Sequence, residues 1–315
     1  MITVAIKHKT TYQYDRSVVL GPQIVRLRPA PQCRTPITSY SLDVTPKENF
    51  VNWQQDVHGN YLARFVFPKS TGPTKCFQVN VDFVAAMIEI NPFNFFLEET
   101  AEQFPFEYES ALKKDLRGYL EVTEHNQPLL SFLETVERTP RRTIDFLVDL
   151  NQRVEQRVDY EVRMESGVQS AEETLNLGKG SCRDSAWLLV QVLRHLGLAA
   201  RFVSGYLIQL KSDMEASNDS TGPKEDFTDL HAWTEVFLPG AGWVGLDPTS
   251  GLLAGEGHIP LACTPAPLAA APISGTVENC KVEFEHHMSI ERVHKDPRIP
   301  KPHSATWATT ENTNR

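Results

Sequence analysis

Hydrophobic and polar residues alternate along the first 90 residues in short runs that are separated by turns. An alternation of period two is typical of strands that bury one face. His58-Gly59-Asn60 is typical of a hairpin turn, and it lies between two such runs. The clearest runs are residues 4–6, 25–27, 40–44, 62–67 and 77–83. We therefore predict an antiparallel β-sandwich domain over residues 1–90.

The period changes to that of a helix between residues 91 and 157. Thr139 followed by Pro140 is typical of a helix start, and apolar residues then recur on one face as far as Val154. Farther on, Ser170 and Glu173 form the pattern of a capping box. The brief helix that this box predicts leads the chain to Gly178. We interpret residues 91–157 as a helical connecting region that precedes a core.

The segment 180–193 predicts a helix with a cysteine in its first turn. Ser181 can cap this helix and Asp184 follows it at capping-box spacing, while apolar residues recur at helical spacing until Gly197. A helix N-terminus or a nearby cation can lower the pKa of a thiol from about 8.5 to roughly 3.5 to 7.5. Cys182 is therefore placed for reactivity. The alternative is a small buried thiol in a core helix, because free cysteines are among the most buried residues.

Two strands with chemically useful residues follow the Cys182 helix. A strand is predicted over residues 200–210, and the polar, acidic run 211–228 predicts an exposed loop. The segments 231–237 and 243–247 then flank a short turn that contains two glycines, which predicts an antiparallel hairpin. In such a hairpin the start of one strand lies opposite the end of the other. We therefore expect His231 and Asp247 to be near neighbours.

A cysteine at a helix start, a histidine and a carboxylate are the three parts of an activated thiol. Cys182 would attack a carbonyl carbon, His231 would keep it as thiolate and later protonate the leaving amine, and Asp247 would fix the histidine tautomer. The backbone N–H of Cys182 would be one oxyanion donor. The indole of Trp187, Trp233 or Trp243 would be a candidate for the second donor.

Composition narrows the classes of partner. The chain has 315 residues and a net charge of -9 with no basic run, which argues against nucleic acid or a membrane surface as partner. No run approaches the roughly 18 apolar residues of a membrane span, and the N-terminus does not resemble a secretory signal, so we expect a cytoplasmic protein. Its five cysteines are scattered, which favours reduced thiols over disulfides or a zinc site. No cofactor or metal is expected.

Arg26-Leu27-Arg28 is the one strand-like run that is rich in arginine. It could bind an anionic group. The alternative is a solvated face or a face at a domain interface.

Around these residues the chain resembles the transglutaminase-like superfamily of papain-like cysteine enzymes. The resemblance covers roughly residues 158–250, where the cysteine, histidine and aspartate blocks occur in the family's order. It rests on Gly178 to Asp184, on residues 201–206, on 229–235 and on 242–249. The first 90 residues resemble the β domain that precedes this core in bacterial transglutaminase-like proteins. The resemblance implies an α+β fold in which the helix that bears Cys182 packs on an antiparallel sheet.

The sequence thus predicts a β-sandwich at 1–90, a helical connecting region at 91–157, a transglutaminase-like core at 158–295 and a flexible tail at 296–315. The expected function is thiol-dependent cleavage of peptide or carboxamide bonds by Cys182, His231 and Asp247, as in a cysteine peptidase or amidase. The alternatives are a protein-glutamine transglutaminase and a non-catalytic peptide-binding module. The expected partner is a peptide or protein substrate, together with a further polypeptide region or a partner protein beyond the C-terminus.

Overall fold

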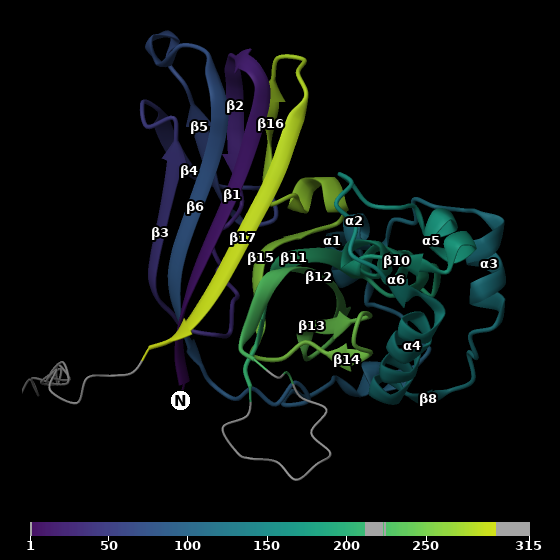
Figure 1. Cartoon of the computed structure of the whole chain (residues 1–315). Helices are drawn as coiled ribbons and strands as arrows, with labels where there is room; N and C mark the ends of the chain where they lie inside the picture. The colour runs from purple at the N-terminus through teal and green to yellow at the C-terminus, as the bar shows by residue number, and fades with distance from the viewer. Residues whose placement is uncertain (1, 212–222, 224, 294–315) are drawn as a thin grey trace, which may run out of the picture.

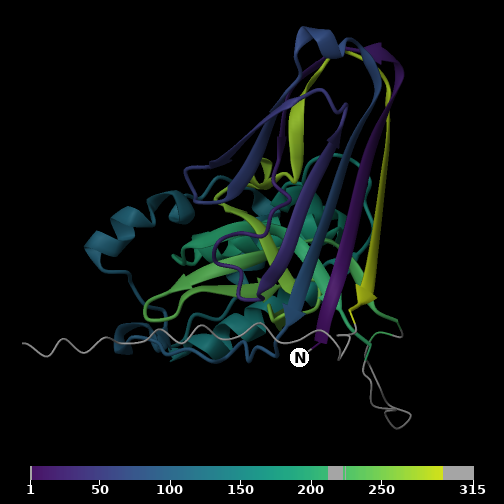
Figure 2. The same cartoon turned by 90° about the vertical axis from the view of Figure 1, so that its left-hand side faces the viewer.

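The computed structural model describes residues 2–211, 223 and 225–293 (Figure 1). The predicted tail at 296–315 and most of the predicted loop at 211–228 lie outside the described residues. In the described part, a sheet lies between a tall β-sandwich on one side and a group of helices on the other. Figure 2 shows the sandwich from its own side, with long strands that extend beyond the central sheet.

The sandwich consists of two antiparallel sheets, as the alternation of the first 90 residues predicts. Their strand orders are β17-β1-β6-β3 and β16-β2-β5-β4. In β6 the apolar residues at alternate positions from Phe77 to Phe83 are buried between the sheets, which is the predicted pattern of period two. The strands are β1 (Ile2–Val18), β2 (Leu20–Val25), β3 (Ile37–Thr45), β4 (Phe50–Gln55), β5 (Tyr61–Val66), β6 (Thr74–Met87), β16 (Ile273–Val277) and β17 (Val282–Arg292).

The predicted hairpin turn at His58-Gly59-Asn60 is confirmed between β4 and β5. Gly59 has a φ of 83°, a value that favours glycine. The carboxylate of Asp56 accepts the backbone N–H groups of His58 at 2.8 Å and of Asn60 at 2.9 Å. These bonds hold the turn closed.

The last two described strands correct one expectation. All residues from 158 to 295 are predicted to belong to the transglutaminase-like core. In the structure β17 pairs with β1, and β16 pairs with β2. Both therefore widen the N-terminal sandwich. The alternation of a strand shows that it buries one face, but it does not show which sheet offers the free edge.

The central sheet is antiparallel and has the order β14-β13-β12-β11-β15. The predicted hairpin of β12 and β13 is confirmed, with Thr234 opposite Leu246. The strands are β11 (Ala200–Gln209), β12 (Phe227–Leu238), β13 (Gly242–Asp247), β14 (Leu252–Leu253) and β15 (His258–Thr264).

Helix α6 (Cys182–His195) is the centre of the helical layer. Its residues from Asp184 to Arg194 are all buried, because the central sheet covers one side and α3, α4 and α5 contact the others. This explains why its apolar residues are not confined to a single stripe. The other helices are α1 (Ser110–Asp115), α2 (Arg117–Leu120), α3 (Gln127–Glu134), α4 (Thr143–Arg157) and α5 (Ala171–Leu177), with short 3₁₀ turns at Lys69–Thr71, Glu99–Ala101 and Pro267–Ala270.

Short strand pairs join the segments between these elements. β9 (Asp159–Tyr160) runs parallel to β10 (Lys179–Gly180) just before α6, and β7 (Gln103–Phe104) pairs with β8 (Arg141–Arg142) before α4. Within the described residues, no helix is both long and apolar enough to cross a bilayer.

The central sheet is fixed against the sandwich by buried contacts. Tyr206 and Ile208 of β11 belong to the same apolar cluster as the interior of the sandwich. The hydroxyl of Tyr206 lies 2.8 Å from Nδ1 of His8 in β1, and its ring stacks on Phe83 of β6. These contacts hold β11, the strand beside β12, in a fixed position.

Candidate active site

Cys182 lies at the start of α6, as predicted. The carboxylate of Asp184 accepts the backbone N–H of Ser181 at 2.8 Å and its hydroxyl at 2.7 Å. Nε of Arg163 donates to the same carboxylate at 2.8 Å. A Cβ at Gly180 would lie 2.9 Å from Cβ of Asp184, so only glycine fits this approach. Asp184 therefore anchors the start of the helix, and the Cys182 side chain remains partly exposed.

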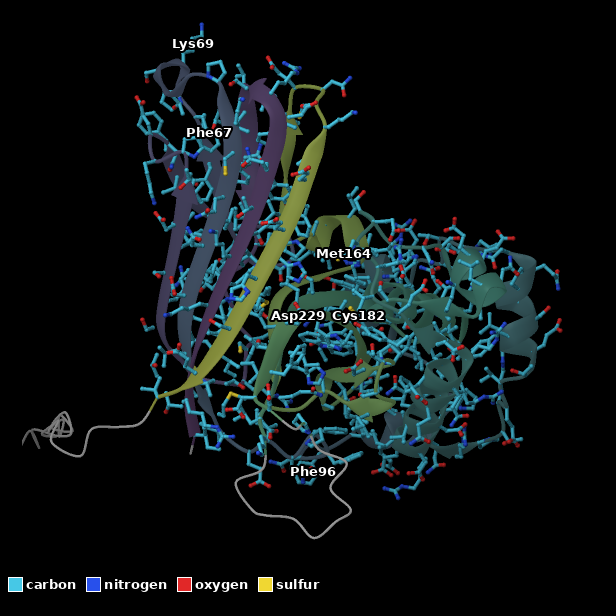
Figure 3. All side chains as sticks on the ribbon, in the orientation of Figure 1. Phe67, Lys69, Phe96, Met164, Cys182 and Asp229 are labelled. Carbon is cyan, nitrogen blue, oxygen red and sulfur yellow. The ribbon has the colours of Figure 1, made fainter. Side chains whose placement is uncertain are left out.

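Tyr160 lies beside this helix start. It pairs with Gly180 across β9 and β10, and its side chain is 57% exposed. Partial burial raises the pKa of its phenol, and the negative charges of Cys182 and Asp229 raise it further. The pairing with Gly180 places Tyr160 close to the start of α6. Figure 3 labels Cys182 and Asp229 beside the central sheet.

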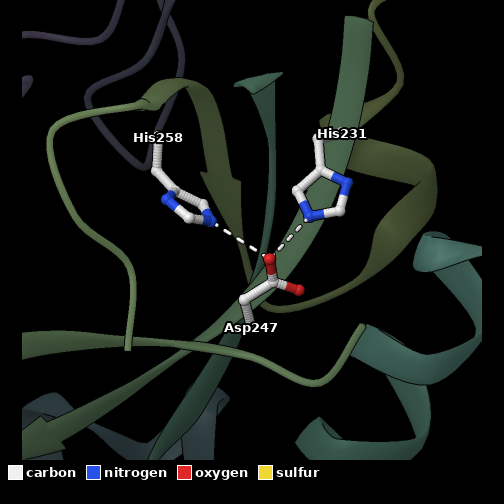
Figure 4. A group of neighbouring side chains, drawn as sticks. All are labelled: His231, Asp247 and His258. Carbon is white, nitrogen blue, oxygen red and sulfur yellow. Dashed lines mark hydrogen bonds and ion pairs between the residues drawn. The ribbon is translucent and has the colours of Figure 1, made fainter. Parts of the chain in front are cut away.

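His231 and Asp247 meet across the hairpin of β12 and β13. Because Thr234 is opposite Leu246, the register places Asp247 opposite Trp233 and diagonal to His231. Nε2 of His231 donates to Oδ2 of Asp247 at 2.9 Å (Figure 4). The expected proximity of these two residues is confirmed.

Cys182 acts on the same ring, because its interactions with His231 help to raise the pKa of that histidine. The structure thus joins His231 directly to Asp247 and couples His231 electrostatically to Cys182.

The pKa of His231 reflects this arrangement. Burial by itself would lower that pKa, but the hydrogen bonds and negative charges of Asp247 and Cys182 outweigh burial and raise it to about 10. For Asp247, burial favours the neutral acid, but hydrogen bonds from His231 and His258 hold the pKa of its carboxyl well below the usual range. At neutral pH the site therefore contains an imidazolium beside an ionised carboxylate.

His258 is a further residue of the site that sequence reasoning missed. It begins β15, and its Nε2 lies 3.2 Å from the same Oδ2 of Asp247 (Figure 4). Its Nδ1 accepts the backbone N–H of Gly255 at 3.2 Å. A neutral ring that accepts at Nδ1 carries its proton at Nε2. His258 therefore donates to the carboxylate without needing a charge.

His231, Asp247 and His258 are residue types that bind metals, and their ligand atoms lie within 4.8 Å of one another. The hydrogen bonds of these three residues argue against a metal site. Both Nε2 atoms donate to the carboxylate, and the bond from Gly255 keeps the proton of neutral His258 on the nitrogen that would face the metal. The cluster therefore fits a carboxylate with two donors better than a cation site.

Among the described residues, no contact places any of the three indoles as the second oxyanion donor. Nε1 of Trp187 donates to Glu124 at 2.6 Å, and Trp243 packs under the guanidinium of Arg201 with 4.2 Å between Cζ and the ring centroid. Nε1 of Trp233 has no partner, but this residue lines a cavity of about 400 Å³ that neither Cys182 nor His231 borders. The backbone N–H of Cys182, which has no acceptor within its own helix, is the donor that the helix start provides.

Comparison with known proteins finds a family match for two parts of the chain. Residues 4–86 match the bacterial transglutaminase-like N-terminal region, and residues 131–248 match the transglutaminase-like superfamily. An uncharacterized protein of Mycobacterium tuberculosis is 26% identical over 270 residues, which are 81% of each chain. An uncharacterized protein of Mycobacterium bovis gives the same values.

A solved structure from Cytophaga hutchinsonii, provisionally described as a cysteine protease, has a similar fold. Its TM-score is 0.65 at 19% identity, and the match covers 94% of this chain and 92% of that one. The predicted α+β fold, with a cysteine-bearing helix on an antiparallel sheet behind a β-sandwich, is thereby confirmed.

Proposed function

Because the chain belongs to the transglutaminase-like superfamily and carries the bacterial N-terminal region of that family, we propose that it is a thiol-dependent acyl-transfer enzyme that cleaves peptide or carboxamide bonds. The observation that carries this proposal is the position of His231. Its Nε2 donates to Asp247 at 2.9 Å, and its pKa is raised by Asp247 and by Cys182. A protein that only binds peptides has no need of this linked arrangement.

The proposed reaction has two stages. The thiolate of Cys182 attacks the carbonyl carbon, and the N–H groups at the start of α6 stabilise the oxyanion that forms. The imidazolium of His231 then gives its Nδ1 proton to the leaving nitrogen, the C–N bond breaks, and a thioester remains on Cys182. In the second stage neutral His231 takes a proton from water, the hydroxide adds to the thioester carbon, and the C–S bond breaks. The acid is released, and the Cys182 thiolate and the His231 imidazolium are restored.

Asp247 acts through His231 in both stages. Its carboxylate holds the ring with Nε2 protonated and stabilises the imidazolium. His258 and the backbone N–H of Thr249, which donates to Oδ1 at 2.9 Å, fix the orientation of that carboxylate.

Water is the proposed acceptor of the acyl group. The Cys182 side chain is partly exposed, and the neighbouring Tyr160 is 57% exposed. A thioester on an open site reacts with water, whereas transfer to an amine requires a site that shields the thioester and holds the amine. A peptidase or amidase is therefore favoured over a transglutaminase. A cytoplasmic location, a peptide or protein substrate and an additional polypeptide partner remain predictions.

The test is product analysis with a panel of peptides that contain glutamine, asparagine and ordinary peptide bonds. The protein is incubated with each peptide, with and without an excess of a labelled primary amine, and the products are identified by mass. We expect cleaved or deamidated peptide with little amine incorporation. Cys182→Ala should abolish turnover, and Cys76→Ala, a half-buried cysteine of the sandwich, should retain it.

If amine adducts predominate and depend on Cys182, the protein is a transglutaminase and the assignment as a hydrolase is wrong. If the protein binds peptides but turns over no amide, it is a non-catalytic peptide-binding module and not an enzyme.

A further inference from the structure

A second cavity, of about 640 Å³, lies in the N-terminal sandwich. It is lined by the loop and strand residues 36–42, by Trp53 of β4, by Tyr61 of β5 and by Arg28. Among the residues that the structure describes, Arg28 is the only charged one that borders it, although the chain as a whole has a net charge of -9. We call this cavity the Arg28 pocket.

The guanidinium of Arg28 is held by aromatic rings. Its Cζ lies 4.5 Å from the ring centroid of Tyr61, 5.3 Å from that of Trp53 and 5.8 Å from that of Tyr40. Rings stack on the faces of a guanidinium and leave the N–H groups at its planar edge. Among the described residues, no side chain or carbonyl accepts a hydrogen bond from Arg28, and no carboxylate pairs with it. The pocket therefore contains an oriented cation without an anion.

Arg26, two residues before Arg28, differs from it because Arg26 has hydrogen-bond partners. Nη1 of Arg26 donates to the carbonyl of Ala271 at 3.2 Å and to the hydroxyl of Ser274 at 3.1 Å. It joins the loop after β2 to the segment at β16. The two arginines of this run therefore differ: Arg26 is held by hydrogen bonds to Ala271 and to Ser274 of the same sandwich, whereas Arg28 is left for an anion.

Tyr40 supplies a second observation. Its hydroxyl oxygen is buried and has no hydrogen-bond partner among the described residues, although a buried hydroxyl without a partner is costly. Burial raises the pKa of this phenol, and the nearby Arg28 charge acts in the opposite direction. The hydroxyl is thus a neutral donor close to Arg28.

The shape of the pocket indicates what the anion is attached to. β3 pairs only with β6 and β4 only with β5 in the described chain, so both strands have a free edge beside the pocket. Figure 1 shows β3 and β4 together at the side of the sandwich that faces away from the helices. Free strand edges bind extended peptides through backbone hydrogen bonds. On β4, Val51 shares a face with Trp53 and is 49% exposed, so an apolar contact continues beyond the aromatic rings.

We propose that the Arg28 pocket binds the C-terminal carboxylate of an extended peptide whose last residue is apolar. The planar edge of Arg28 takes the carboxylate through two N–H groups, and the hydroxyl of Tyr40 donates to the same anion. Trp53, Tyr61 and Val51 contact the apolar side chain, and the edge of β3 pairs with the peptide backbone. A single arginine matches the single charge of a carboxylate, and the volume exceeds what a bare anion fills.

The test is isothermal titration calorimetry on the full chain with Cys182→Ala, which prevents cleavage. The probe is an acetylated five-residue peptide of threonine and valine that ends in leucine, prepared as the free acid and as the C-terminal amide. We expect the acid to bind at least about tenfold more tightly than the amide, because charge-assisted hydrogen bonds are lost with the carboxylate. N-acetyl-leucine, which has the carboxylate but no strand, should bind more weakly than the peptide acid.

Variants assign the binding to the pocket. Arg28→Gln should remove the preference for the peptide acid over the amide. Tyr40→Phe removes only the hydroxyl without a partner, and it should lower the affinity for the peptide acid several-fold. Arg64→Gln alters an exposed arginine on β5, and it should change neither the affinity for the peptide acid nor the preference for the acid over the amide. Circular dichroism establishes that each variant is folded, and Tyr40→Phe tests the pocket even if Arg28→Gln unfolds.

Equal affinity for acid and amide, or the same preference in Arg28→Gln and Tyr40→Phe, would overturn the proposal, and so would a failure of the peptide acid to bind. If N-acetyl-leucine binds as tightly as the peptide acid, the pocket is a site for small carboxylates and the peptide assignment is wrong.

Discussion

Nε2 of His258 lies 3.2 Å from Oδ2 of Asp247, and the same oxygen accepts the hydrogen bond from His231. One carboxylate oxygen therefore receives two imidazole donors, while Oδ1 receives the backbone N–H of Thr249. An anion that is held from several sides cannot rotate away from His231. The orientation of the proposed catalytic histidine thus depends on a residue from a third strand, β15.

Replacement of His258 should show this dependence. His258→Phe removes the donor, and we expect kcat to fall about 10- to 100-fold with little change in KM, because a hydrogen bond to a charged group is worth about 1.5 to 3 kcal/mol. His258→Gln can donate to Asp247 and accept from Gly255, so it should recover most of the activity. Steady-state kinetics of both variants measures the effect. Equal activity of His258→Phe and the wild type would remove His258 from the site.

The pKa of His231 predicts how activity depends on pH. This pKa is raised to about 10, so the imidazolium is present at neutral pH and is lost as the pH rises through that value. We expect kcat/KM to remain constant as the pH rises to about 9 and to decline above it. In Asp247→Ala the effect of burial is no longer offset by the carboxylate, so the decline should begin at a lower pH.

Nuclear magnetic resonance of histidine-labelled protein measures the same ionisation directly. The His231 signal should remain that of an imidazolium at pH 7 in the wild type. Titration of His231 near its ordinary pKa of about 6.5, unchanged in Asp247→Ala, would contradict the ion-pair description.

His8 should make the free energy of unfolding depend on pH in the acidic range. Burial, and then the charge of His286, lower the pKa of His8 to about 4 from 6.5, and the ring is neutral between Tyr206 and Thr10. The unfolded chain therefore binds this proton at a higher pH than the folded chain. The stabilising contribution is complete above pH 6.5 and is lost as the pH falls toward 4, by about 3 kcal/mol.

Urea unfolding at pH 7 and pH 4.5 tests this prediction. In His8→Gln, which can keep the hydrogen bonds without the titration, the loss between the two pH values should be smaller. His287→Gln, at an exposed position of β17, should behave as the wild type. An equal loss in His8→Gln and the wild type would show that His8 does not couple folding to protons.

The sequence could predict the features that depend on local patterns. The capping residues around Cys182, the hairpin turn at Gly59 and the proximity of His231 and Asp247 follow from spacing along a single helix or hairpin. The strand alternation likewise predicts a sandwich over the first 90 residues. In each case the partners lie close in sequence, so periodicity and turn chemistry determine the geometry.

Other features depend on pairings between distant segments. β17 pairs with β1 although more than 250 residues separate them, and no local pattern identifies that partner. His258 reaches Asp247 because β15 pairs with β11, where His258 is opposite Leu207. The signal that could have identified it is a histidine at the start of the strand that returns after the aspartate. The indole of Trp187 is unavailable because it bonds to Glu124, 63 residues earlier.

The central claim is that Cys182 is an activated nucleophile, and selective alkylation tests it most directly. At pH 6 an ordinary thiol, with a pKa of about 8.5, is almost entirely protonated, and burial raises the pKa of Cys33 to about 11. The protein is treated with iodoacetamide at pH 6, and the five cysteines are followed over time by peptide mass spectrometry. We predict that Cys182 is modified first, at least about tenfold faster than Cys33 and Cys76, and that His231→Ala slows its modification while leaving the others unchanged. Modification of Cys182 at the same rate as Cys76, or a rate that is the same in His231→Ala, would contradict the account.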